Sequence, residues 1–252
     1  MLNKVPEVTI FFWIIKIMAT TVGETAADYL SATLALGLAV AMGLVTAFLV
    51  VVLALQFRAR GYVAGLYWLA VVLISIAGTL ITDYLVDERG VTLWTTTILF
   101  AIALGATFAI WFAGERTLSI HTINTTKRET FYWSAILFTF ALGTAAGDLI
   151  AEEFNLGYWK SAILFGVLIG AVTAAWRWFG LNPVPAFWLA YILTRPLGAS
   201  LGDYFSQPTA DGGVGLGAVL TTAIFLSTIL GVVVYLIRTR KDQPALAVPP
   251  TG

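Results

Sequence analysis

The sequence contains no cysteine and only one histidine, and this scarcity excludes several kinds of chemistry. Without cysteine there is no thiolate catalysis and no disulfide bond, and no His/Cys metal cluster can form. The histidine, His121, lies in a polar segment, where we expect a solvated side chain. A phosphate-binding loop, a dinucleotide fingerprint and a serine-nucleophile motif are also missing. We therefore expect no enzyme, no catalytic residues and no cofactor.

Charged residues are scarce as well, at 11% of the chain, while 59% of the residues are hydrophobic. Soluble domains carry roughly 25% charged residues. The mean hydropathy of +0.89 predicts an integral membrane protein with the lipid bilayer as its partner. The net charge of zero leaves no basic surface that would bind a nucleic acid.

Apolar stretches long enough to cross a membrane occur eight times, since a helical span needs roughly 20 residues. The stretches lack the short alternating segments of an outer-membrane barrel, and a helix satisfies its own backbone hydrogen bonds in lipid. The sequence therefore predicts an all-α fold with eight transmembrane helices. They are expected at about residues 8–30, 32–57, 63–86, 91–113, 130–151, 158–179, 184–205 and 213–238.

Positive side chains gather at one end of these spans, whereas the opposite loops carry only Arg89 and Lys160 beside several acidic residues. Because cytoplasmic loops are enriched in Lys and Arg, both termini are predicted to lie in the cytoplasm. The expected location is the cytoplasmic membrane of a bacterium. The residues assigned to the cytoplasmic side are Lys4, Arg58, Arg60, Arg116, Lys127, Arg128, Arg177, Arg238, Arg240 and Lys241.

The chain also contains a four-fold internal repeat. In four places a tryptophan is followed ten residues later by a glycine and fifteen residues later by an aspartate, which indicates internal duplication. The first repeat includes the N-terminal apolar run, so we do not expect that run to be a cleaved signal peptide. The four units are Trp13/Gly23/Asp28, Trp68/Gly78/Asp83, Trp133/Gly143/Asp148 and Trp188/Gly198/Asp203.

Each repeat holds two spans, so all copies enter the membrane with the same orientation, and a symmetry axis along the membrane normal is expected. The Trp-to-Trp intervals of 55, 65 and 55 residues predict two four-helix halves joined by the segment 115–129. Within one membrane domain, the repeats are placed at residues 5–60, 61–116, 128–180 and 183–240, followed by a disordered tail at 241–252.

An aromatic residue precedes each of the four tryptophans, namely Phe12, Tyr67, Tyr132 and Phe187. With these residues, the four units resemble the bacterial membrane-anchored proteins built from four tandem copies of a two-helix repeat of unknown function. The resemblance covers nearly the whole chain and implies an architecture rather than a substrate. Two positions depart from the pattern: Leu149 stands where the other copies have tyrosine, and Ala199 stands where they have Glu or Thr.

The positions 3, 7, 11 and 15 residues after each repeat tryptophan are four residues apart, so they share one helix face, which ends in the aspartate. Ionisable groups inside a membrane each cost about 2.5 to 3.5 kcal/mol on insertion scales, so they normally face a cavity or one another. We therefore expect the four aspartates to converge on one axis, with Lys16 and Arg195 as internal counter-ions whose partners come from neighbouring helices. The four faces read Lys16, Thr20, Glu24, Asp28; Val71, Ser75, Thr79, Asp83; Ile136, Phe140, Thr144, Asp148; and Tyr191, Arg195, Ala199, Asp203.

The tryptophans lie about 22 Å along the helix from the aspartates, at 1.5 Å per residue, which places them near the cytoplasmic interface. Their simplest interpretation is as anchors in an aromatic belt. The glycines are expected to permit close helix contact, with local unwinding as the alternative. An aspartate near a helix C-terminus faces the negative end of the macrodipole, so a cation, a proton, or a buried Lys or Arg must compensate.

We expect a transporter for a small hard cation, with protons as candidate exchange ions. The ion-binding residues would be Asp28, Asp83, Asp148, Asp203, Glu24, Thr79 and Thr144. A metal site at the four aspartates is a hypothesis, and oxygen ligands favour manganese or magnesium over copper or zinc. Two alternatives stay open: a proton-coupled anion or carboxylate carrier that binds its substrate through Lys16 and Arg195, and a non-transporting membrane scaffold or sensor.

Overall fold

A computed structural model describes residues 2–243, and this part of the chain contains long helices and no strand. The all-α prediction and the expected number of long helices are confirmed. Each helix lies within a few residues of its predicted position. The helices are α1 (Ile10–Asp28), α2 (Leu38–Arg58), α3 (Ala64–Asp83), α4 (Leu93–Glu115), α5 (Thr126–Asp148), α6 (Tyr158–Trp178), α7 (Pro183–Ser206) and α8 (Gly217–Thr239).

Seven of the described helices are long and apolar enough to cross a membrane. The helix that does not meet this criterion is α7, although it is 24 residues long. Its sequence includes three prolines, Arg195 and Asp203, which lower its hydropathy. The helix that falls short of this criterion is therefore the one that carries the buried Arg195.

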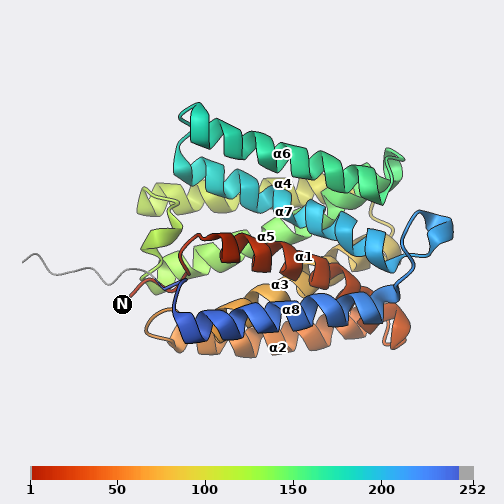
Figure 1. The fold of residues 1–252 in the computed structure, drawn as a ribbon, viewed down its shortest axis with the longest axis horizontal. Helices are drawn as coiled ribbons and strands as arrows, with labels where there is room; N and C mark the ends of the chain where they lie inside the picture. Colours follow the sequence, from red (N-terminus) through yellow and green to blue (C-terminus); the bar gives the residue numbers. More distant parts are fainter. Residues whose placement is uncertain (1, 244–252) are drawn as a thin grey trace, which may run out of the picture.

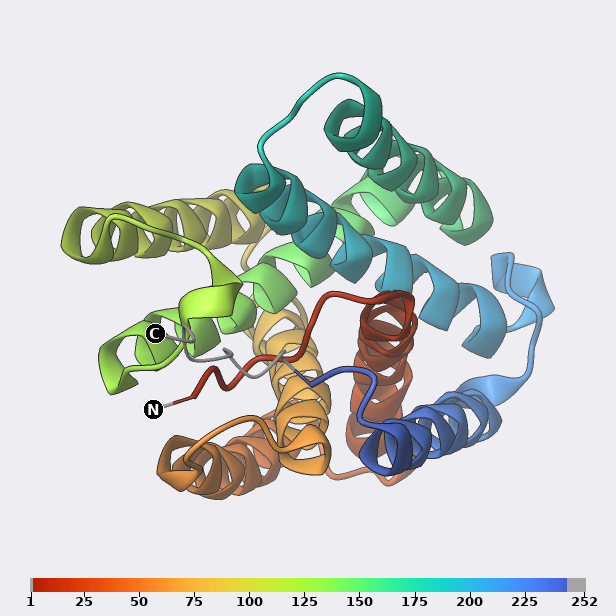
Figure 2. The same ribbon diagram turned by 60° about the vertical axis from the view of Figure 1, so that its left-hand side comes forward.

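The first helix of each repeat belongs to an inner ring, and the second helix lies outside it (Figures 1 and 2). In the ring, α1 packs on α3, α3 on α5, α5 on α7, and α7 on α1. In the apolar windows of α1, α3 and α5, 61–72% of the residues are buried, against 17–22% in the outer helices. The repeats are therefore arranged around one axis.

Each outer helix packs on the inner helix of the following repeat: α2 on α3, α4 on α5, α6 on α7, and α8 back on α1. The predicted division into two four-helix halves is therefore wrong, because α4 packs across the supposed boundary. The longer segment between α4 and α5 lies at the end of the bundle instead. There Ile123 accepts a backbone hydrogen bond from Lys4, and Leu118 accepts one from the Trp188 indole.

The repeat glycines allow the inner helices to approach closely, as predicted. A Cβ atom at any of them would collide with the next inner helix around the ring. These contacts run once around the ring, so the same residue type closes all four interfaces. The pairs are Gly23 with Ser75, Gly78 with Phe140, Gly143 with Arg195, and Gly198 with Thr20.

Local widening of the helix occurs after the aspartates rather than at the glycines. In the first three repeats a π-helical turn follows the aspartate directly, at Tyr29–Thr33, Tyr84–Glu88 and Leu149–Glu153. The helix therefore continues one turn beyond these aspartates. In the fourth repeat α7 continues as an α-helix through Asp203. Single π turns inside helices are frequent at functional sites.

The interpretation of the repeat tryptophans as a lipid-facing belt is wrong. Trp68, Trp133 and Trp188 are 2–4% exposed, and Trp13 is half-buried. Three residues turn a helix by about 300°, so each tryptophan lies only about 60° from the inward polar face. The tryptophans pack with the aromatic residues that precede them and form the interior of one end of the ring.

The beginning of the predicted tail is ordered, whereas residues 244–252 lie outside the described part. Asp242 is buried and accepts hydrogen bonds from the Tyr62 hydroxyl, at 2.5 Å, and through its backbone carbonyl from the Glu7 amide, at 2.9 Å. Burial and the hydrogen bond to Asp242 raise the pKa of the Tyr62 phenol. The segment after α8 is thus attached to the end of the bundle where α1 begins.

Candidate functional site

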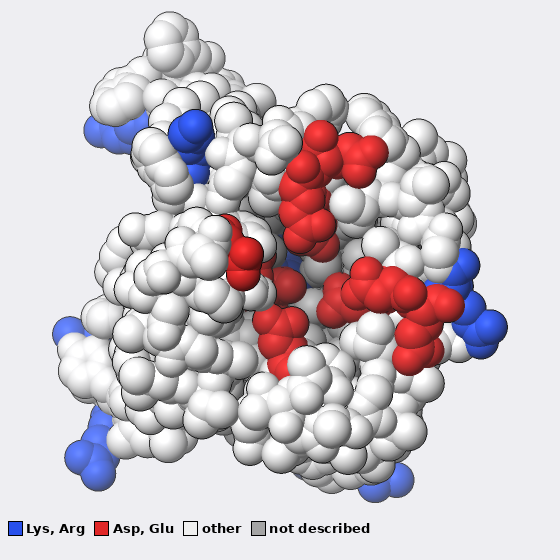
Figure 3. Space-filling view, turned by 90° about the vertical axis from the view of Figure 1, so that its right-hand side faces the viewer, with Lys and Arg blue, Asp and Glu red and all other residues white. Residues whose placement is uncertain are grey.

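The four repeat aspartates converge on one cavity, as the shared helix face predicts. The cavity has a volume of about 160 Å³ and lies at the end of the ring opposite the tryptophans. Figure 3 shows acidic side chains around a hollow in this face of the molecule. The predicted residues among its lining are Glu24, Asp28, Asp83, Asp148 and Asp203.

The sequence analysis missed Tyr158 and three polar residues that continue the inner helices: Asp87, Glu152 and Gln207. Asp87, Glu152 and Gln207 each lie four residues after the repeat aspartate and nineteen residues after the repeat tryptophan. One more step of four along the polar face would have found them. The acidic pair was instead assigned to the outer loops, because the π turns that extend the helices were not expected.

Seven carboxylate side chains and no Lys or Arg are among the residues that line this cavity. Like charges in one partly enclosed site cannot all ionise without cations or protons to compensate them. The described residues include no group of three or more Asp, Glu or His side chains close enough to hold one metal ion. The four aspartates therefore do not form a preorganised metal site here.

Arg195 lies beneath the cavity and connects all four inner helices. From α7, its guanidinium donates to the Glu24 carboxylate at 3.0 Å and to the Thr20 carbonyl at 3.2 Å, both on α1. It also donates to the hydroxyl of Thr79 on α3 and, at 2.6 Å, to that of Thr144 on α5. Arg195 is fully buried, so these bonds replace its hydration.

These contacts confirm that Arg195 has partners on neighbouring helices, and they explain a departure in the repeat pattern. Glu24, Thr79 and Thr144 occupy the same position of their repeats, where the fourth repeat has Ala199. The side chains at this position in the first three repeats accept hydrogen bonds from the guanidinium. In the fourth repeat, Arg195 lies one turn before Ala199. The two threonines predicted to bind an ion are therefore bonded to Arg195 in this structure.

Lys16 does not pair with a carboxylate, which corrects its prediction as an internal counter-ion. Its side chain is fully buried, and its Nζ atom has no hydrogen-bond partner among the described residues. The Nζ atom lies 4.1 Å from the centre of the Phe140 ring and 4.2 Å from that of Tyr191. The sequence could not show this, because Glu24 lies eight residues from Lys16, about two helical turns away, and is bonded to Arg195.

The opposite end of the ring is closed. Within it, the hydroxyls of Tyr67 and Tyr132 are bonded at 2.5 Å. Across the end, Lys4 forms a buried ion pair with Glu129 at 2.6 Å and donates to the Phe57 carbonyl at 2.9 Å. The ring therefore has its cavity at the acidic end and is filled by buried side chains at the other.

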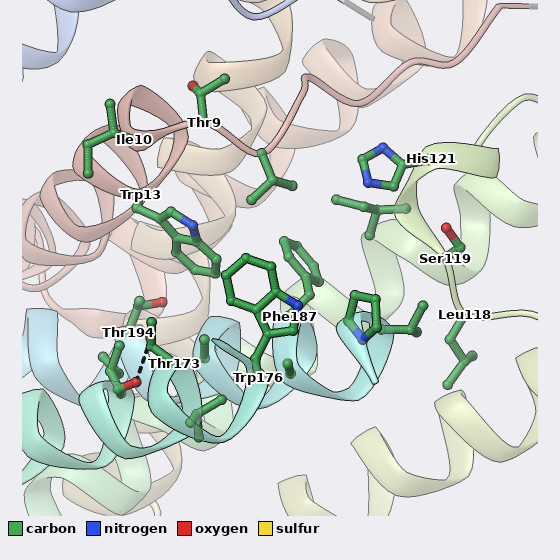
Figure 4. Close-up of a pocket in the computed structure, with 18 of the residues that line it drawn as sticks. Thr9, Ile10, Trp13, Leu118, Ser119, His121, Thr173, Trp176, Phe187 and Thr194 are labelled. Atoms are coloured by element: carbon green, nitrogen blue, oxygen red, sulfur yellow. Dashed lines mark hydrogen bonds between the residues drawn. The ribbon is translucent and has the colours of Figure 1, made fainter. Parts of the chain in front are cut away.

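A second, apolar cavity of about 580 Å³ lies beside the ring, between α1, α6, α7 and the segment 118–121 (Figure 4). Trp13, Trp176 and Phe187 are among its lining residues. His121 is at its edge, with its side chain 53% exposed and 3.8 Å from Glu7, which agrees with the expected solvated position. Its lining contains no carboxylate, so the acidic cavity remains the candidate site.

The fold and the site define a closed ring of four two-helix repeats with an acidic cavity at one end. The chain belongs to the family described as Repeat of Unknown Function (DUF347), which matches it four times, at residues 11–62, 66–117, 131–181 and 186–242. The resemblance recognised from the sequence is thus confirmed. No curated protein and no solved structure matches the chain.

Proposed function

We propose that this protein transports a small cation across the bacterial cytoplasmic membrane in exchange for protons. The observation that carries the proposal is the cavity of seven carboxylates directly above Arg195. A cleft lined by one sign of charge concentrates ions of the opposite sign. An ion-conducting route along the axis of the ring would begin in this cavity.

Insertion in a membrane is supported by the outer helices. They expose large apolar side chains such as Phe48, Ile98, Ile102 and Val167, at 51–65% of their area. Such a surface would aggregate in water, whereas in lipid it is solvated by acyl chains. The excess of Lys and Arg at the closed end supports cytoplasmic termini, so the acidic cavity would face the outside of the cell.

A cation fits the site better than an anion does. An anion would have to pass seven carboxylates before it reached Arg195, whose guanidinium is already bonded to Glu24. A cation instead offsets the repulsion among the carboxylates, and protons do so in its absence. Binding of the cation would therefore release protons from these carboxylates.

A scaffold without transport activity is the second candidate, because Arg195 links all four inner helices. The two candidates differ in what they require of the aspartates. A scaffold needs the bonds of Arg195, whereas a transporter also needs the four carboxylates above it.

The test is cation flux into proteoliposomes with the internal pH recorded. We expect sodium, potassium, magnesium or manganese to enter with opposite movement of protons. The variant Asp28→Asn/Asp83→Asn/Asp148→Asn/Asp203→Asn should lose at least about tenfold in rate, which corresponds to about 1.4 kcal/mol. Asp211→Asn, at the same end but outside the cavity lining, is the matched control. Unchanged flux in a folded quadruple variant would favour the scaffold.

A further inference from the structure

Two lysines are buried in the described part of the chain, and their surroundings differ. Lys4 is held as an ammonium by Glu129 at 2.6 Å and by the carbonyl of Phe57 at 2.9 Å. The Nζ atom of Lys16 has no hydrogen-bond acceptor among the described residues. A buried ammonium whose N–H groups lack acceptors is strongly disfavoured, and such a group commonly loses its proton instead.

The Lys16 nitrogen lies between two aromatic rings. The rings of Phe140 and Tyr191 are nearly parallel, at 9° with centres 6.2 Å apart, and Nζ is 4.1 and 4.2 Å from these centres. An aromatic ring attracts a cation by about 2 kcal/mol or more when both are desolvated. The rings therefore make the protonated form accessible without fixing it as an ion pair would.

A second cation lies one helical turn from Lys16: Arg195, on the neighbouring helix α7, donates to the carbonyl of Thr20, four residues after Lys16. Tyr191 is the titratable group in contact with it. Other ionisable groups on the packed helices are directed elsewhere: Tyr67 of α3 is bonded to Tyr132, and Tyr235 of α8 is 39% exposed. Among the described residues, no carboxylate forms a hydrogen bond or an ion pair with Lys16, and Glu24 on the same helix face is bonded to Arg195.

We propose that Lys16 is the proton-carrying group of the pathway, a neutral amine in this conformation that is protonated in another. This inference rests on the proposed function and identifies the group that exchanges protons for the cation. The amine takes a proton from water on one side, becomes an ammonium, and returns the proton to water on the other side. Arg195 cannot do this, because a guanidinium keeps its proton in proteins.

Protonation of Lys16 would also couple to the acidic cavity. A positive charge on Lys16 would repel the Arg195 guanidinium, which lies between Lys16 and the carboxylates. Displacement of Arg195 toward Glu24 and the cavity would weaken the binding of a cation there. The proton and the transported cation would therefore exclude each other, as exchange in opposite directions requires.

The charge state of Lys16 can be measured without any transport assay. The chain has five lysines, so the protein with labelled lysine side chains, in lipid nanodiscs, should give five resolvable amine signals. Lys16→Met identifies the Lys16 signal, with Lys16→Gln as a second variant should the first not fold. At about pH 8 we expect a neutral amine for Lys16 and ammonium groups for the other four. An ammonium signal for Lys16 would overturn the proposal.

The coupling is measured in proteoliposomes that contain either wild-type protein or Lys16→Met. We expect proton movement per transported cation to fall at least fivefold in the variant, while cation binding at the acidic cavity is retained. Lys16→Arg, which keeps a permanent charge, should slow both fluxes. Normal proton exchange in Lys16→Met would contradict the role of Lys16 but leave the proposed function intact. Absence of any wild-type cation flux would instead contradict the proposed function, and the amine signal would still decide the state of Lys16.

Discussion

At one end of the inner ring, seven carboxylates surround a cavity of about 160 Å³. At the other end, aromatic side chains and the described segments before α1 and after α8 fill the space. Both ends come from the same repeat unit. The tryptophan and its preceding aromatic residue supply bulk at one end, and the short aspartate followed by a π turn leaves space at the other. One repeated sequence can therefore fill the axis of a four-fold ring with side chains at one end and leave a cavity on it at the other.

The two ends also differ in whether their buried charges are paired. At the closed end Lys4 and Glu129 form a pair with complementary charges. At the open end the carboxylates face one another, and Glu24 is the one bonded to Arg195. Removing one partner of a buried pair leaves an uncompensated charge, whereas removing one of several like charges relieves repulsion. Substitutions at the closed end should therefore lower stability, and those at the open end should lower binding.

The largest loss of stability is expected for Arg195→Met, at the residue between the acidic cavity and the aromatic end of the ring. The variant leaves Glu24 as an unpaired buried carboxylate, and breaking a buried pair in this way costs about 3–5 kcal/mol. Denaturation in detergent would measure the loss. Arg195→Met/Glu24→Gln should recover part of it because neither charge remains. A double variant less stable than the single one would contradict the structural role assigned to this pair.

The same Arg195→Met variant separates cation from anion transport through its binding affinity. A transported cation should bind as tightly as before or more tightly, because a competing positive charge has been removed. An anion carrier would lose its substrate site. Calorimetric titration of the folded variant with each ion provides the comparison, and a complete loss of affinity for every cation would reject the cation proposal.

A smaller loss is expected at the closed end, in Glu129→Gln. Removing this carboxylate takes a charged hydrogen bond from Lys4, and such bonds contribute about 1.5–3 kcal/mol. The matched control is Lys127→Met, whose pair with Glu115 is at the surface, where an ion pair contributes about 0–1 kcal/mol. Equal unfolding free energies for the two variants would show that the closed end is not held by the buried pair.

A loss of about 1–3 kcal/mol is expected when the ring is overpacked by Gly143→Ala. The added methyl would collide with the side chain of Arg195 on the adjacent inner helix. Gly105→Ala in the outer helix α4 has open space around it and should be neutral or slightly stabilising, since alanine favours helix by about 1 kcal/mol over glycine. Similar midpoints of thermal unfolding for both variants would argue against close packing of the ring.

The smallest effect on stability is expected at the open end, in Asp83→Asn. Asparagine keeps the volume and removes one of several mutually repelling charges, so the unfolding free energy should change by less than about 1 kcal/mol. Cation affinity should fall about tenfold, or about 1.4 kcal/mol. If Asp83→Asn were strongly destabilised but bound cations normally, the open end would contribute stability rather than binding, contrary to this expectation.

Much of this site could be predicted from the spacing of a few residues. The aspartates and Glu24 recur at helical spacing on one face of each first helix, and an ionisable face in lipid must turn inward. The repeat glycines were correctly expected to permit close contact. The extension of the site to Asp87, Glu152 and Gln207 follows the same spacing but depends on the π turns, which nothing in the pattern indicated.

Other features could not be predicted because they depend on which helices become neighbours. The tryptophans were placed at the lipid interface from their depth alone, although their angle to the polar face directs them inward. The interval of 65 residues between Trp68 and Trp133 indicated two halves, yet the extra residues cross the end of the bundle and leave the ring continuous. Lys16 has no carboxylate partner because Arg195 is bonded to the nearest one.

The sequence by itself determined the repeats, the helices and the inward direction of the polar faces, because helical period and the cost of polar groups in lipid act within each segment. Only the tertiary structure decided which side chains pair with the buried Arg195 and which surround the buried Lys16. The partners of Arg195 lie 51 to 175 residues away along the chain. Glu24, Thr79 and Thr144 hold equivalent positions in three repeats, and the packing of the inner helices brings all three to one guanidinium. The same packing leaves Lys16 between two aromatic rings.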